Sequence, residues 1–127
     1  MTKPYTTCAA CPGYEWPGYV AAELAPQAKV VLLGMAPAAE EISTGRPFQG
    51  SAGKLLNAWL QQAGIARSRC VVDNVVRCRP PSNGLSKHCP AAYESCREGT
   101  RMLLAQVRPN LVITFGNEPL QVICDIS

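Results

Sequence analysis

The stretch GMAPAAEEISTGRPFQGSAG, residues Gly34–Gly53, decides the fold of this chain. It follows an apolar run, Val30–Leu33, which is typical of a buried parallel strand, and it leads into a helical pattern. A loop that joins a buried strand to a helix N-terminus is where α/β proteins hold phosphates and small polar ligands. The Gly-x-Ala-Pro turn and the mid-loop aromatic Phe48 therefore predict a pocket wall for a flat ligand near a phosphate.

Outward from this loop, strand and helix patterns alternate along the chain. Because that order implies a parallel sheet with helices on both faces, we predict a three-layer αβα fold whose ligands bind at the carboxyl ends of the strands. A further short helix is expected around Val20–Leu24. The predicted helices are residues 52–63, residues 90–107 and a last one from Gly116-Asn117, and the predicted later strands are Cys70–Val76 and Leu111–Phe115.

One domain is predicted over residues 1–127, with a cysteine-bearing N-terminal arm at 1–28 and an α/β core at 29–127. A chain of this length buries roughly two-thirds of its unfolded surface. No apolar run approaches the roughly 20 residues that span a bilayer, and the N-terminus lacks a signal-peptide core, so a cytoplasmic protein without a membrane partner is expected. Three strands make a small sheet, so we expect the fold to be incomplete at its C-terminus.

Seven cysteines are many for a cytoplasmic chain, and their odd number argues against a closed disulfide framework. The Cys8-x-x-Cys11 spacing lets two thiolates bind one metal ion or cluster edge. With Cys78 and Cys96 this pair would form a four-thiolate site, for which spacing alone favours zinc over an iron–sulfur cluster and both over free thiols. Cys89 is a rival fourth ligand, whereas Cys70 and Cys124 are expected in the core.

Two side chains near the predicted strand ends suit a nucleobase. Phe48 is either a core aromatic or a stacking platform, and such stacking stabilises a base by about 1–3 kcal/mol. Asn74 is either a satisfied buried amide or a group that binds the edge of a base through paired donor and acceptor atoms. Glu40 and Glu41 are expected to be solvated acids. The net charge of +3 is modest and does not by itself indicate nucleic acid.

Several motifs occur in an order that is specific to one family. They are Cys8-x-x-Cys11, GMAPA at 34–38, TGRPFQGSAG at 44–53, DNVVRCRPP at 73–81, Cys96 and Arg108-Pro109. On these motifs, and over nearly its whole length, the chain resembles the iron–sulfur uracil-DNA glycosylases, the thermophile-type families of the uracil-DNA glycosylase superfamily. It is also similar to the glycosylase-like domains of some phage DNA polymerases.

The resemblance implies roles for the residues at these motifs. Phe48 would stack on a uracil flipped out of DNA and Asn74 would hydrogen-bond its edge, as enzymes that extract a base require. A [4Fe–4S] cluster, in place of zinc, would be bound by Cys8, Cys11, Cys78 and Cys96. The turn residues Gly34, Met35, Ala36 and Pro37 would line the pocket beside the glycosidic bond, and Ser51, Arg77, Arg79, Lys87 and Arg101 would face DNA.

Two departures from the family pattern bear on activity. Met35 stands where the most active members carry an acidic residue, and a methionine cannot orient or activate water. The family fold also continues to a further strand and a histidine-containing loop, onto which His88 does not map.

We therefore expect weak or absent uracil excision by this chain alone. The alternative is a non-catalytic module that binds single-stranded or uracil-containing DNA, a replication protein or a glycosylase inhibitor protein. A zinc-stabilised domain of unrelated function is the third possibility.

Overall fold

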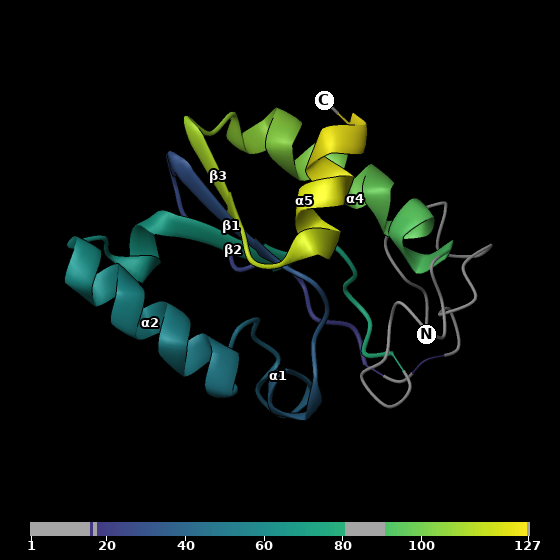
Figure 1. Cartoon of the computed structure of the whole chain (residues 1–127), viewed down its shortest axis with the longest axis horizontal. Coiled ribbons are helices and arrows are strands. Elements are labelled where there is room, and N and C mark those ends of the chain that lie inside the picture. The colour runs from purple at the N-terminus through teal and green to yellow at the C-terminus, as the bar shows by residue number, and fades with distance from the viewer. Residues whose placement is uncertain (1–15, 17, 81–90, 127) are drawn as a thin grey trace.

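The computed structural model describes residues 16, 18–80 and 91–126, in which strands and helices alternate along the chain (Figure 1). The predicted α/β order is confirmed, with boundaries shifted by one or two residues. Cys8, Cys11, Lys87, His88 and Cys89 lie outside the described residues. The elements are β1 (Val30–Gly34), α1 (Ala39–Thr44), α2 (Ser51–Ala63), the 3₁₀ turn η3 (Arg67–Arg69), β2 (Cys70–Asn74), α4 (Ala91–Val107), β3 (Leu111–Thr114) and α5 (Asn117–Ile126).

The three strands form one parallel sheet in the order β2-β1-β3. Val30 of β1 lies opposite Cys70 on one side and Leu111 on the other. At the carboxyl end of the same register Gly34 lies opposite Asn74. The sheet therefore brings two of the predicted ligand-binding residues side by side.

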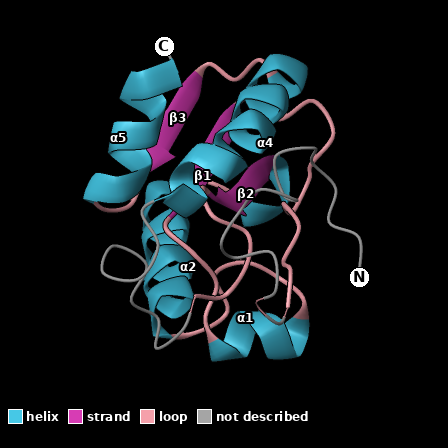
Figure 2. Cartoon of the chain, turned by 90° about the vertical axis from the view of Figure 1, so that its right-hand side faces the viewer, coloured by secondary structure: helices cyan, strands magenta, loops and turns pink. Residues whose placement is uncertain are grey.

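Helices cover both faces of the sheet, as continuous apolar strand sequences require. On one face Leu32 and Val72 pack against Leu56 and Leu60 of α2. On the other face Val31 and its neighbours pack against α4 and α5. Figure 1 shows α2 on one side of the strands and α4 with α5 on the other, and Figure 2 shows α1 displaced from these layers. The three-layer prediction is confirmed.

The segment before β1 runs along the outer edge of β2 and is not the short helix predicted around Val20–Leu24. Tyr19 forms an antiparallel bridge with Cys78, and Glu23 forms one with Val72. The Glu23 N–H donates to the Val72 carbonyl at 2.7 Å, and the Val72 N–H donates to the Glu23 carbonyl at 2.9 Å. A helix of one turn has little intrinsic stability, so the unpaired edge of β2 determines the conformation of this segment.

The C-terminal residues form a helix of ten residues, longer than the helix start that the sequence indicated. Val122 is buried in the core between the sheet and α4, and Ile123 packs beside it. Cys124, which was expected in the core, is exposed on the outer side of α5, so that expectation was wrong. No described helix is long and apolar enough to cross a membrane.

Candidate functional site

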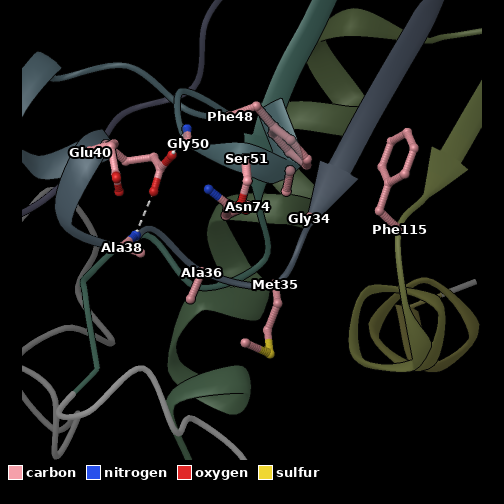
Figure 3. Close-up of a pocket in the computed structure, with 12 residues that line it drawn as sticks. Gly34, Met35, Ala36, Ala38, Glu40, Phe48, Gly50, Ser51, Asn74 and Phe115 are labelled. Carbon is pink, nitrogen blue, oxygen red and sulfur yellow. Dashed lines mark hydrogen bonds between the residues drawn. The ribbon is translucent and has the colours of Figure 1, made fainter. Parts of the chain in front are cut away.

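A pocket of about 310 Å³ lies at the carboxyl ends of β1 and β2, where the topology predicted it (Figure 3). That volume falls at the lower end of the range for small-molecule sites. Its walls come from the turn after β1, helix α1, the loop before α2 with the first turn of that helix, the end of β2 and the residue after β3. The lining residues are Gly34, Met35, Ala36, Ala38, Glu40, Glu41, Phe48, Gly50, Ser51, Ala52, Asn74 and Phe115.

Gly34, Phe48 and Asn74, the three residues predicted to hold a base, converge in this pocket. A Cβ placed on Gly34 would lie 2.5 Å from the Phe48 ring and 2.6 Å from Asn74 Oδ1. No side chain fits in that space, so only glycine at 34 lets the aromatic ring and the amide approach this closely. The phenyl ring and the amide group thus form adjoining walls, one apolar and flat and the other able to donate and accept hydrogen bonds.

Asn74 as a residue is 5% exposed, and its side-chain amide makes no hydrogen bond among the described residues. The Asn74 backbone N–H donates to Asp73 Oδ1 at 2.8 Å. Because Asn74 lines the pocket, the donor and acceptor groups of its amide are available to water or to a ligand. The end of β2 is therefore suited to hold a ligand with complementary polar atoms.

Phe48 has a backbone conformation that non-glycine residues rarely adopt, with φ of 54°. Its ring contacts Phe115 edge-on, with centroids 5.6 Å apart, and Phe115 in turn stacks on Trp59 at 6.4 Å. A Cβ on Gly53 would overlap the Phe48 carbonyl, so glycine is required where α2 passes the loop. The loop is thus closely packed against α2 and against Phe115, which also lines the pocket.

Glu41 is buried at 8% exposure, so the expectation of a solvated acid at this position was wrong. Its Oε1 accepts the Ala38 N–H at 2.7 Å, and its Oε2 accepts the N–H groups of Gln49 and Gly50 at 2.8 and 2.9 Å. Burial alone would raise the pKa of Glu41, but these three backbone donors outweigh it, and the pKa is lowered from its ordinary value. The carboxylate therefore joins the turn after β1 to the loop that carries Phe48.

The predicted turn residues Met35, Ala36 and Pro37 follow β1 directly. Met35 and Ala36 line the pocket, whereas Pro37 is buried and is not among the lining residues. The Met35 side chain points away from Phe48 and Asn74 (Figure 3) and packs against the cluster that contains Cys96. No carboxylate stands at position 35.

The residues predicted to face DNA occupy different environments. Ser51 lies at the pocket mouth and Arg101 is exposed on α4, while Arg79 is partly exposed. Arg77 is 1% exposed and ion-paired with Asp73, at 2.5 Å between Nη2 and Oδ2, so its assignment to a DNA surface was wrong. Asp73 follows three apolar residues of β2, and its buried carboxylate explains why the arginine four residues later turns inward.

The Asp73–Arg77 pair also joins two cysteine-bearing segments. Arg77 Nη1 donates to the carbonyl of Cys96 at 3.3 Å, which links the residue before Cys78 to α4. Cys78 and Cys96 are both buried. Within residues 16, 18–80 and 91–126 no group of three or more metal-ligating side chains occurs. Burial raises the pKa of Asp73, and the Arg77 guanidinium opposes that rise.

Sequence reasoning missed three residues that shape the pocket. Glu41 is the third residue of α1, and a glutamate at this position is a known helix-start signal. Phe115 directly follows the last strand, so topology alone places it at the carboxyl edge. Arg67, whose guanidinium donates to the Pro47 and Phe48 carbonyls, carries no local signal because its partners are 19 and 20 residues away.

Comparison with known proteins gives consistent matches. The sequence model of the Uracil DNA glycosylase superfamily matches residues 21–126. The chain is similar to the type-4 uracil-DNA glycosylase of Thermotoga maritima, at 36% identity over 93% of this chain and 61% of the relative. It is also similar to the type-4 uracil-DNA glycosylase of Archaeoglobus fulgidus, at 35% identity over 79% of this chain and 49% of the relative. The chain thus spans about half to three-fifths of the length of these two relatives.

Proposed function

The chain belongs to the uracil-DNA glycosylase superfamily, and from this premise we propose that its pocket binds a uracil flipped out of DNA. Phe48 stacks on the base, and the Asn74 amide hydrogen-bonds its polar edge. In DNA the base must leave the stack to reach such a pocket. Ser51 and Arg101 contact the phosphates nearby.

The observation that carries this proposal is the convergence of Gly34, Phe48 and Asn74. A flat aromatic wall and a side-chain amide that lines the pocket meet at a glycine that leaves no room for a side chain. The chemistry of this pair suits a planar base with hydrogen-bonding groups along one edge. The match of residues 21–126 to the superfamily supports uracil as the base.

We propose further that hydrolysis of the N-glycosidic bond by this chain alone is slow. An acid beside the bond would orient the attacking water and stabilise positive charge on the sugar. Position 35 supplies a thioether in place of an acid, and that side chain packs away from the base-binding residues. Binding and orientation of the base are therefore retained, while the group that would accelerate bond cleavage is replaced.

A [4Fe–4S] cluster bound by Cys8, Cys11, Cys78 and Cys96 is the proposed cofactor. The observation that bears on the fit is the Arg77 bond to the Cys96 carbonyl, which ties the segments of two of these cysteines together. Cysteine thiolates are the usual ligands of such a cluster, and the burial of Cys78 and Cys96 would limit its exposure to solvent. The cluster would stabilise the fold and take no part in hydrolysis. Iron and sulfide analysis of anaerobically purified protein, with Cys78→Ser and Cys96→Ser variants as comparisons, tests the assignment.

Binding and excision are measured on the same oligonucleotide. Single-stranded DNA with one uracil is titrated by fluorescence anisotropy against an identical strand with thymine. We expect tighter binding to the uracil strand and a loss of about 5–150-fold in Phe48→Ala, which corresponds to about 1–3 kcal/mol of stacking. Equal affinity for the two strands would refute the assignment of the pocket.

The slow chemistry is tested separately in a single-turnover assay for abasic sites. Uracil-specific excision complete within the mixing time would refute the part assigned to Met35. DNA binding without excision is the second candidate function, and the apolar residue at position 35 favours it. A loss of affinity for both strands in Arg101→Glu, with folding intact, would support the DNA surface.

A further inference from the structure

Phe48 is held in a left-handed backbone conformation that must be stabilised by its surroundings. A non-glycine residue with φ of 54° is strained unless neighbouring groups hold it there. The direction of the phenyl ring depends on that backbone, because the alternative extended conformation would turn the side chain elsewhere. Whatever fixes the backbone of residue 48 therefore fixes the aromatic wall of the pocket.

The guanidinium of Arg67 binds this backbone from outside the pocket. Its Nη2 donates to the Pro47 carbonyl at 2.6 Å and its Nη1 to the Phe48 carbonyl at 3.1 Å. Nη1 also donates to Asn57 Oδ1 on α2 at 2.9 Å. A planar guanidinium holds two neighbouring carbonyl groups in a fixed relation, which a lysine ammonium cannot do.

Glu23 orients the Arg67 side chain. Arg67 Nε donates to Glu23 Oε1 at 3.0 Å, and Glu23 Oε2 accepts from Arg46 Nε at 2.7 Å. The Arg67 side chain is only 15% exposed and that of Glu23 21%, so this pair is shielded from much of the solvent. Because the Glu23 backbone is bonded to Val72 on β2, the guanidinium is fixed to the sheet through its partner.

We propose that Arg67, oriented by Glu23, is a positioning residue that sets the direction of the Phe48 ring and thereby the pocket's preference for a stacked pyrimidine base. Arg67 acts through the Pro47 and Phe48 carbonyls and does not touch the base. This inference rests on the proposed uracil binding for its functional consequence. Its structural part, the control of the Phe48 conformation, stands on the hydrogen bonds alone.

The chain has only two phenylalanines, Phe48 and Phe115, and they are in contact. Protein labelled with 4-fluorophenylalanine therefore gives two ¹⁹F resonances, which a Phe115→Leu variant assigns. We expect the Phe48 resonance to split or broaden in Arg67→Lys, because lysine keeps the charge but cannot hold both carbonyls. The exposed Arg69, two residues away, provides the matched control in Arg69→Lys, which is expected to leave the resonance unchanged.

The functional arm uses the uracil and thymine strands described above. In Arg67→Lys we expect the affinity for the uracil strand to fall by about fivefold, the effect of losing about one hydrogen bond, while the affinity for the thymine strand is unchanged. Glu23→Gln should act in the same direction more weakly, and it replaces Arg67→Lys if that variant does not fold.

A sharp, unshifted Phe48 resonance in folded Arg67→Lys or Glu23→Gln would overturn the inference. So would an equal fall in affinity for both strands, because it would make Arg67 a general DNA contact. If the unsubstituted protein shows no preference for uracil, the proposed function fails, and the ¹⁹F spectra still decide whether Arg67 controls Phe48.

Discussion

Replacing Glu41 by glutamine should loosen the pocket although the two side chains have nearly the same shape. The Glu41 carboxylate accepts three backbone N–H groups, one from the turn after β1 and two from the loop that carries Phe48. Glutamine offers one oxygen and one NH₂ group. In its best orientation the oxygen keeps the bonds to Gln49 and Gly50, and the NH₂ group then faces the Ala38 N–H.

The expected loss follows from these bonds. In the variant one charge-assisted hydrogen bond is lost and two others become bonds to a neutral oxygen. A hydrogen bond to a charged group contributes about 1.5–3 kcal/mol to the stability of the folded state, and a neutral one about 0.5–1.5 kcal/mol. Because Glu41 retains some solvent contact, we expect Glu41→Gln to lower the free energy of unfolding by about 2–4 kcal/mol. The affinity for uracil-containing DNA should fall with it, since the two pocket walls are no longer joined.

Urea denaturation followed by circular dichroism at neutral pH measures this loss. The matched control is Glu40→Gln, which changes the same functional group one residue away on an exposed side chain and should leave the midpoint unchanged. A Glu41→Gln variant as stable as the unsubstituted protein would refute the argument that this carboxylate joins the two walls. Equal destabilisation by both substitutions would instead indicate a general effect of charge near α1.

Three further predictions concern pH, the buried ion pair and the packing of α2. Because the pKa of Glu41 is lowered in the folded state, its carboxylate contributes fully to stability above the unfolded pKa of about 4.5, and this contribution is lost as the pH falls through the lower folded value. The stability difference between the unsubstituted protein and Glu41→Gln should therefore shrink below pH 4.5. A difference that does not change with pH would contradict this. Asp73→Asn should lower the free energy of unfolding, measured by urea denaturation, by about 3–5 kcal/mol because it leaves the buried Arg77 guanidinium without its carboxylate partner. A loss under about 1 kcal/mol would show that the pair is not coupled. Gly53→Ala should lower the midpoint of thermal unfolding and abolish the preference for uracil, because the alanine methyl group would overlap the Phe48 carbonyl. Unchanged binding would mean that the loop moves freely.

The layers of the fold were predictable because local patterns specify them. The apolar residues Val31–Leu33 and Cys70–Val72 are buried within the sheet, and Gly64 ends α2 in the left-handed conformation typical of a helix C-terminus. Topology then placed Gly34 beside Asn74 without any knowledge of side chains. The helix predicted around Val20–Leu24 was wrong, because the conformation of this segment depends on the edge of β2, which is distant in the sequence.

The parts of the site that sequence could not give depend on contacts between distant residues. Arg67 reaches back 20 residues to Pro47, and nothing near Arg67 in the chain indicates that partner. Arg77 belongs to a basic segment, which favours a solvated surface, yet Asp73 draws it into the interior. The sequence shows that a segment is rich in charged residues, but the packing of the folded chain decides which of those residues is buried.

The Asp73–Arg77 pair has a consequence for how this sequence can change. Each buried charge is stabilised by the other, so a substitution at either position alone leaves a buried charge that lacks its counter-charge. A simultaneous change to two apolar residues of similar volume avoids that intermediate and is close to neutral. The two positions are therefore expected to covary, and a substitution at one of them should be interpreted together with the residue at the other.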